Sequence, residues 1–348
     1  MGFNGGGLTR RGGGAAIVDK LFKMTINTTG TFFLPLNSAA MNVTVNWGDG
    51  SSDVITSYNQ TERTHVYATA GVYQISIDGQ FGGMAINQNA ISKLQVASID
   101  NWGTAVLSSG SVGLRGCSNM VGYYTDNPNM SICTTTAYMF NLCSSFNSPL
   151  TLDMSKVTTI TNMFSSASSF NSLLTLNDTS KVTTTAYMFN GCSSYNKPLT
   201  LDLKNCTTMN NMFNGCSSLN SLLTFNNTSN VTNMGQMFVG NTVFNTSVSS
   251  FDTSSVTNMY QMFRFASAFN QDLSGWNISS LTNATLMLNG TSFDTTNYDL
   301  LLISWAAQTH NNNVPFHAGT AQYSSGAAAN ARAVLIADGW TITDGGQV

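Results

Sequence analysis

A short phrase, Met-Phe, recurs through the second half of the chain at steps of 24 or 25 residues. Two further tracks keep the same phase: an aromatic-Asn pair begins seven residues after most of the Met residues, and Val, Cys or Leu stands six residues before each. A constant period in this range is typical of repeat arrays, in which a unit buries its apolar positions only against its neighbours. The pairs begin at Met139, Met163, Met188, Met212, Met237 and Met262, and Met287-Leu288 continues the series.

Within each unit the apolar runs are too brief for long helices. Segments such as Leu199–Leu201 and Leu222–Phe225 fit short strands and tight coils, and the Asn, Ser, Thr and Gly between them are turn residues. We therefore predict a solenoid of seven to eight coils over residues 114–294, with Met over Met and Phe over Phe in one continuous core.

The unit carries a family resemblance. The copy VTNMYQMFRFASAFNQDLSGWNISS, at Val256–Ser280, resembles the repeat of about 25 residues of the BspA-like leucine-rich-repeat surface proteins. The resemblance implies a leucine-rich-repeat-type solenoid, and surface attachment or ligand binding rather than catalysis. The departure is Trp276, since earlier copies carry Leu, Phe or Asp near that place.

A different pattern occupies residues 24–80. Alternation in NVTVNW and VYQISI predicts strands, and Gly48-Asp49-Gly50 predicts a turn. The series WGDGS…HVYATAGVYQISI resembles PKD-type immunoglobulin-like β-sandwiches, which are usually spacers or binding modules. We expect Asp49 to cap its own turn, and His65 and Tyr67 to pack or hydrogen-bond across strands, in preference to a catalytic or metal-binding role.

The remaining segments complete a mainly β fold class with a small α/β C-terminal cap. Residues 1–23 form a glycine-rich arm with Arg10 and Arg11, either a disordered tail or a peptide that docks on a neighbouring subunit. Residues 81–113 are expected to be an entry cap, with Trp102 covering the open end of the stack. Residues 295–348 are expected to close the other end, since the terminal coil of a stack needs a cap.

Two helices and a strand are predicted in that C-terminal cap. The first helix covers Thr296–Gln308 with Thr296 or Asn297 as its N-cap; the second covers Ser324–Trp340 and ends at Gly339; a strand follows over Trp340–Thr343. This ending resembles the cap of BspA-like proteins in phage and marine bacterial sequences.

Composition excludes several function classes. Charged residues are only 8% and the net charge is −3, so no basic patch is expected for nucleic acid. No apolar run approaches the roughly 18–20 residues of a membrane span, so membrane insertion is not expected. The start of the chain lacks the apolar segment of a secretory signal, which favours a virion protein over an exported adhesin.

The six cysteines follow the repeat. Cys117, Cys143, Cys192 and Cys216 share one position, and Cys133 and Cys206 stand where other copies have Val. A residue that alternates with Val behaves as a small buried hydrophobe, so buried thiols are expected. Bridges Cys117–Cys143 and Cys192–Cys216 stay open as the alternative in an oxidising setting.

No enzyme, cofactor or metal site is predicted. Paired carboxylates would be needed for glycoside hydrolysis, but the repeat aspartates are better interpreted as turn residues. Nucleophile-elbow, metalloprotease and phosphate-loop motifs are absent. The aspartates in question are Asp153, Asp202, Asp252 and Asp272.

The combined expectation is a non-enzymatic attachment protein on the surface of a phage virion: a fibre, receptor-binding or capsid decoration protein. Its arm, with Arg10 and Arg11 as candidate anchors, would contact other virion proteins, and its solenoid would bind a host surface protein or glycan; a homo-oligomer is possible. The alternative is a secreted or cell-surface bacterial adhesin. Candidate ligand-facing residues, which could equally be ordinary solvent-facing turns, are Tyr138, Tyr187, Asn210, Gln236, Tyr260 and Gln261.

Overall fold

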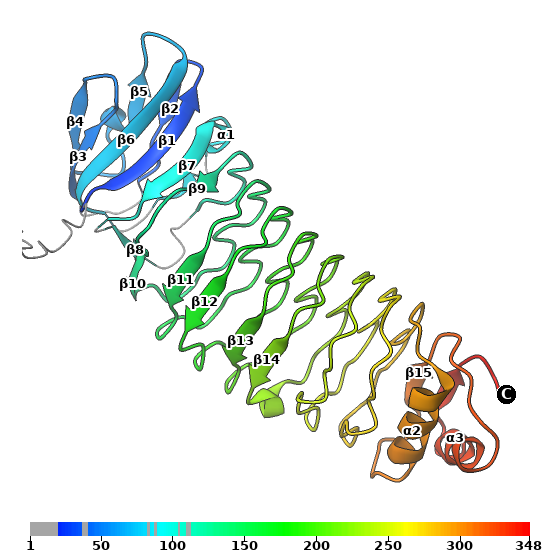
Figure 1. The fold of residues 1–348 in the computed structure, drawn as a ribbon. Helices are drawn as coiled ribbons and strands as arrows, with labels where there is room; N and C mark the ends of the chain where they lie inside the picture. Colours follow the sequence, from blue (N-terminus) through cyan, green and yellow to red (C-terminus); the bar gives the residue numbers. More distant parts are fainter. Residues whose placement is uncertain (1–19, 37–40, 82–83, 87–88, 104, 109–112) are drawn as a thin grey trace, which may run out of the picture.

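The computed structural model describes residues 20–36, 41–81, 84–86, 89–103, 105–108 and 113–348. The described chain is mainly β, as predicted, with three α-helical segments among these residues. An N-terminal sheet is followed by a long row of coils, and a small helical region stands at the far end (Figure 1).

The N-terminal sheet has six strands in the order β4-β3-β6-β1-β7-β9. Its pairs are antiparallel except the last, β7 with β9. In β1 every second side chain is buried, which is the pattern of a strand with one face on a core. The strands are β1 (Phe22–Thr28), β3 (Asn42–Asn46), β4 (Ser52–Ile55), β6 (Gly71–Gln80), β7 (Val96–Asn101) and β9 (Val121–Gly122), beside a two-stranded pair of β2 (Thr31–Phe33) and β5 (Thr64–Val66).

The sheet crosses the boundaries predicted at residues 80 and 113. Strand β7 belongs to the predicted entry cap, yet it pairs with β1, and β9 of the first coil pairs with β7. Trp102 is fully buried between Phe22 of the sheet and Tyr124 of the first coil, with ring centroids 6.2 and 5.5 Å away. Main-chain pairing therefore runs without a break from the sheet into the coils. Also in this region are η1 (Thr61–Arg63), α1 (Ser92–Gln95) and β8 (Val106–Ser108).

Residues 114–294, here called the coil stack, place equivalent residues of successive repeats side by side. Parallel bridges join Thr135 to Thr159 and continue by one repeat at a time as far as Asn283. Strands β11 (Leu150–Asp153) and β12 (Leu174–Asn177) pair in register, as do β13 (Leu199–Asp202) and β14 (Leu223–Asn226). The stack also contains β10 (Asn129–Ile132), which pairs with β8, and η3 (Thr228–Asn230).

The core of the stack follows the predicted columns. Phe213 is fully buried, and its ring stacks on Phe189 at 5.4 Å and on Phe238 at 5.7 Å. Every Met of the Met-Phe series is buried as well. Burial of this kind contributes about 1.5–3 kcal/mol for each large apolar side chain.

At the far end, α2 (Thr295–Ala306) and α3 (Ala327–Ala337) pack together, and β15 (Pro315–His317) pairs with β16 (Thr341–Thr343). A bridge from Ala284 to Phe316 extends the stack into this region. The predicted N-cap, Thr296 or Asn297, is wrong: the cap is Asp294, whose carboxylate accepts the Asn297 N–H at 2.9 Å. The second helix begins three residues later than predicted, after Gly326, and Gly339 follows its end with φ 83°.

Candidate functional site

The residue directly before each Met, here called the variable column, has an unusual backbone. All seven copies have φ between 55° and 62°, a left-handed conformation that few non-glycine residues adopt. Their side chains differ from copy to copy, although the neighbouring Met and Phe hardly change. The members are Tyr138, Asn162, Tyr187, Asn211, Gln236, Gln261 and Leu286.

Main-chain hydrogen bonds hold this conformation in register. The Tyr138 N–H donates to Thr161 O at 3.1 Å, and the Tyr187 N–H donates to Asn210 O at 3.0 Å. Each bond reaches the next coil, so the column forms a row that runs along the stack. A change of side chain in this row leaves the donor and acceptor of the main chain in place.

Of the predicted ligand-facing residues, Tyr138 and Tyr187 are the most exposed, at 41% and 38%. The amide members interact with one another instead. Asn211 donates to Gln236, and Gln236 donates to Gln261, at 3.3 and 3.2 Å. Gln261 is only 6% exposed because it lies between Gln236 and the Tyr260 hydroxyl, to which it donates at 2.9 Å.

Asn210 and Tyr260 stand one residue earlier and are not members of the variable column. Both side chains are partly buried. Asn210 Oδ1 accepts a 2.7 Å hydrogen bond from the Thr208 hydroxyl. The structure therefore brings Asn211, Gln236, Gln261 and Tyr260 into one hydrogen-bonded group and leaves the tyrosines of earlier coils open to solvent.

A second polar row, which sequence analysis did not assign, accounts for the Asn that stands eight residues after each of the first six Met residues of the series. The Asn220 side-chain oxygen accepts the main-chain N–H of Asn245, and Asn245 does the same for Asn270, both at 2.9 Å. Such an asparagine ladder satisfies an edge N–H that would otherwise lack a protein partner. The recurrence of Asn at this one position of the repeat was the available signal. The acceptors are Asn147, Asn171, Asn196, Asn220, Asn245 and Asn270.

The cysteines are free and buried, as the repeat pattern predicted, and the two alternative bridges are not formed. The Cys192 thiol donates to Phe164 O and the Cys216 thiol to Phe189 O. Burial raises the pKa of Cys143 to about 12. A protonated, enclosed thiol is neither a good nucleophile nor a good metal ligand.

The repeat aspartates are turn residues, as predicted. Asp153 and Asp252 each accept the N–H of the serine two positions later, at 3.0 Å. Asp202 and Asp272 do the same with Lys204 and Ser274. Their carboxylates are committed to local turns and are not paired across a cleft.

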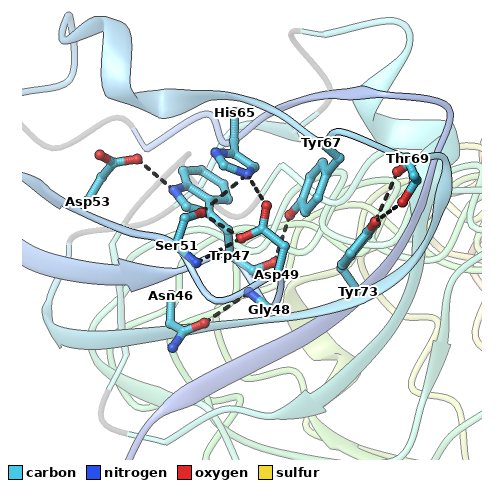
Figure 2. A network of polar contacts seen from close by, with 10 residues as sticks. All are labelled: Asn46, Trp47, Gly48, Asp49, Ser51, Asp53, His65, Tyr67, Thr69 and Tyr73. Atoms are coloured by element: carbon cyan, nitrogen blue, oxygen red, sulfur yellow. Dashed lines mark hydrogen bonds and ion pairs between the residues drawn. The ribbon is translucent and has the colours of Figure 1, made fainter.

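The polar network of the N-terminal sheet contains Asp, His and Ser side chains and is drawn in Figure 2. Asp49 accepts from the Ser51 hydroxyl at 2.6 Å and from the Ser51 N–H at 3.0 Å, and it lies 2.8 Å from His65 Nε2. These contacts, the Ser51 hydroxyl first, hold the pKa of Asp49 far below its ordinary value.

This network joins neighbouring strands and does not have the geometry of a catalytic triad. One imidazole nitrogen, Nε2, faces both Asp49 and Ser51, whereas a catalytic triad needs the two ring nitrogens to face different partners. The His65 ring also stacks flat on Trp47, with centroids 4.8 Å apart and planes at 7°. Tyr67 donates to Trp47 O at 2.9 Å. Asp49 thus caps its turn, and His65 and Tyr67 connect strands, as predicted.

Metal sites, membrane-spanning helices and the candidate anchors were also sought among the described residues. Among them, no group of three His, Cys, Asp or Glu side chains could hold a metal ion. No helix in the described part of the chain is long and apolar enough to cross a membrane. Arg10 and Arg11, the candidate anchors, lie outside the described residues.

Comparison with protein families gives one match. The family described as "Mycoplasma protein of unknown function, DUF285" matches residues 114–226 and 198–301, which together cover more than half of the chain. The chain belongs to this family. The match coincides with the coil stack and extends into α2. No significant match was found among curated proteins or among solved structures.

Proposed function

We propose that this member of the DUF285 family is a non-enzymatic attachment protein that binds its ligand through the variable column of the coil stack. The observation that supports this proposal is the contrast between columns. The Met, Phe and ladder Asn columns repeat nearly the same side chain, whereas the variable column presents Tyr, Asn, Gln or Leu on one fixed backbone conformation. Building the stack does not require this variety, so we assign it to recognition.

The two exposed tyrosines would carry most of the binding energy. Tyr138 and Tyr187 offer an apolar ring and a hydroxyl with little conformational freedom to lose, and such residues dominate binding surfaces. The amide group Asn211–Gln236–Gln261 would form a preorganised border beside them. This combination suits the ring faces and hydroxyls of a surface glycan, or the polar surface of a host protein.

The finer architecture belongs to the same proposal. Residues 24–80 act as a PKD-like module, and the coil stack is a leucine-rich-repeat-type solenoid that displays the binding row. Continuous main-chain pairing from β1 through β7 to β9 would hold the two in a fixed relation. The N-terminal arm, predicted as residues 1–23, then acts as the anchor, although Phe22 and Lys23 already belong to β1. Deleting residues 1–19, which leaves β1 whole, should abolish assembly on a particle without lowering the melting temperature.

The test of binding uses substitutions for which the chain itself provides a template. Asn stands in the variable column at Asn162 and Asn211 with the same backbone, so Tyr138→Asn with Tyr187→Asn should fold normally. We expect this double variant to bind intact host cells and immobilised surface polysaccharides on the order of tenfold more weakly or worse. The control is Tyr58→Asn, which removes a half-exposed tyrosine from the N-terminal region.

The location of the protein needs a separate measurement. A phage virion is the first proposal, and a bacterial cell surface is the second, favoured by a family description that names Mycoplasma. Mass spectrometry of purified phage particles and of host envelope fractions distinguishes them. Stoichiometric amounts in particles support the first, and a signal confined to envelopes supports the second.

A further inference from the structure

A cavity of about 230 Å³ lies at the junction between the N-terminal sheet and the coil stack. It is lined by Lys93 of α1, Arg115 and Gly116 of the first coil, and Leu142 of the second. Hydrogen bonds hold these segments together: Asn119 donates to Leu94 O at 2.8 Å, and Gly116 N–H donates to Asn141 O at 2.7 Å. The cavity is thus built from three segments that the fold fixes in place.

Two positive charges share this cavity. The Cα of Gly116 faces the Lys93 side chain so closely that an added Cβ would lie 3.6 Å from the ammonium nitrogen. The guanidinium carbon of Arg115 lies 4.9 Å from the ring centroid of Tyr138. Stacking on a ring leaves the in-plane N–H groups of an arginine free to donate to another partner.

Neither charge is neutralised within the part of the chain that the structure describes. The ion pairs there join His65 to Asp49, His310 to Asp338 and Arg332 to Asp344. Lys93 and Arg115 are in none of them. Three other cavities of the molecule have no lysine or arginine in their linings. In a chain with a net charge of −3, two adjacent unpaired cations around one cavity are a specific feature.

We propose that this cavity binds the acidic group of an anionic polysaccharide, a carboxylate or a sulfate ester. The inference rests on the proposed function and names its ligand class. Arg115 would donate in the plane of its guanidinium and Lys93 as a point charge, as both do toward oxyanions. Leu142, 47% exposed, would pack against the apolar face of the sugar that carries the acid.

Size and position favour a polymer over a small ion. The cavity volume is several times the roughly 30 Å³ share of one water molecule, so a carboxylate or sulfate alone would leave much of it empty. Tyr138 stacks on Arg115, which lines the cavity, and Tyr138 is also the first member of the variable column. A polysaccharide held here by its acid can continue along that column, past Asn162 to Tyr187.

The same column argues against nucleic acid. A nucleic acid carries a negative charge at every unit and is bound by repeated lysines and arginines. The variable column contains neither residue in any copy. The charge pattern therefore fits a ligand with an acid at the cavity and neutral, hydroxyl-rich units beyond it.

The test compares binding of the full chain to lightly carboxymethylated dextran and lightly sulfated dextran, in which most sugar units stay neutral, with binding to unmodified dextran. We expect the acidic polymers alone to bind, and binding to weaken as salt is raised. Lys93→Gln with Arg115→Gln should lower the affinity on the order of tenfold or more. Leu142→Glu, which places a carboxylate at the cavity while leaving both cations, should do the same if the melting temperature is unchanged.

The matched control is Lys181→Gln with Lys204→Gln, which changes the net charge equally at two exposed positions of the stack. Equal losses in both double variants would overturn the proposal, because binding would then follow net charge alone. Complete displacement of the polymers by an equal concentration of inorganic sulfate would also overturn it, in favour of a small-ion site. Failure of all acidic polymers to bind would do so as well.

One outcome separates this inference from the proposed function. If a neutral polysaccharide or host cells bind wild type and the Lys93/Arg115 variant equally, and Tyr138→Asn with Tyr187→Asn abolishes that binding, the ligand has no acid at the cavity. The proposed function would then stand and the present inference would be wrong.

Discussion

The N-terminal sheet and the coil stack differ in the sequence distance that their main-chain pairing covers. In the sheet, Met24 pairs with Ile75 on one side and Ile99 on the other. In the stack, Thr135 pairs with Thr159, and every later bridge repeats a step of one coil. The sheet combines short pairings, such as Val45 with Asp53, and distant pairings, each of which occurs once, whereas the stack repeats one step many times.

This difference determines what a substitution can be compared with. Every position of the stack has equivalents in other coils, so the chain itself records which side chains a column accepts. The network around Asp49, His65 and Trp47 has no second copy, and its effects must be argued from its own geometry. The following predictions test this contrast, from the largest expected effect to the smallest.

The largest effect is expected from Phe213→Asp. Phe213 is fully buried between two stacked rings, and a carboxylate there would lose its hydration without gaining a partner. We expect a loss of more than about 4 kcal/mol in the free energy of unfolding, which is enough to unfold the stack. Thermal unfolding followed by circular dichroism measures it.

The control for this substitution is Leu222→Asp, at an exposed position of the same coil. It should change the melting temperature little. A melting curve of Phe213→Asp that matches the control would mean that the phenylalanine column does not carry the stability of the stack.

A stabilising substitution is predicted at Asn241. Its side chain is fully buried, and neither its oxygen nor its nitrogen has a hydrogen-bond partner among the residues that the structure describes. The equivalent residues Cys192 and Cys216 each donate to a carbonyl of the preceding coil. Asn241→Cys should therefore raise the free energy of unfolding by about 1–3 kcal/mol, the cost of an unsatisfied buried amide.

The reverse exchange, Cys216→Asn, gives the matched comparison and should destabilise the stack by a similar amount. Chemical denaturation under reducing conditions measures both variants. A loss of stability in Asn241→Cys would show that its amide is satisfied in solution, for instance by an enclosed water.

The third prediction concerns acid stability of the N-terminal sheet. The pKa of Asp49 is lowered below its ordinary 3.8 by the Ser51 hydroxyl, His65 and the Ser51 N–H. A lowered pKa in the folded state contributes stability that is present above the ordinary pKa and is lost as pH falls toward the folded value. The protection factors of the β3 and β6 amides against hydrogen exchange, which correct for the intrinsic pH dependence of exchange, should therefore fall below about pH 4, and less so in Asp49→Asn.

The stack provides the comparison for this measurement. Its lowered carboxyl pKa values are spread over Asp153, Asp252 and Asp294 in different coils. A single Asp252→Asn change should leave most of the acid response of the stack in place. The contrast would be wrong if Asp49→Asn in the sheet and Asp252→Asn in the stack reduced the pH dependence of protection equally. The acid response would then not rest on one carboxylate in the sheet and on several in the stack.

The same contrast explains how far sequence alone could lead. The period of the Met-Phe phrase predicted the buried columns and the thiols, because each unit repeats the evidence seven times. It did not predict the left-handed backbone of the variable column, since Tyr and Gln give no sign of it. The cavity of Lys93 and Arg115 was also beyond prediction, because Lys93 lies outside the repeat and meets Arg115 only through the fold.

A second left-handed column three residues after each Met did carry a signal. Glycine occupies it in four copies, at Gly191, Gly215, Gly240 and Gly290.

The N-cap of α2 shows the opposite case, because two suitable candidates, Thr296 and Asn297, stand near the helix start. Neither is the cap: Asp294 occupies the ladder position, where its N–H donates to Asn270 Oδ1 at 3.0 Å, and its carboxylate accepts the Asn297 N–H.

The smallest effect is expected in this glycine column. Ser166 has φ 60° there, a conformation that costs an L-residue about 1–2 kcal/mol, and Gly relieves it while losing some chain entropy. Ser166→Gly should therefore raise the free energy of unfolding by about 0.5–1 kcal/mol. Gly240→Ala is the converse variant, since an added Cβ meets no atom within 4 Å and only the backbone strain at φ 71° remains. If Gly240→Ala left the stability unchanged, the cost would lie in side-chain contacts instead of the backbone, and neighbouring coils would set the limits of this column.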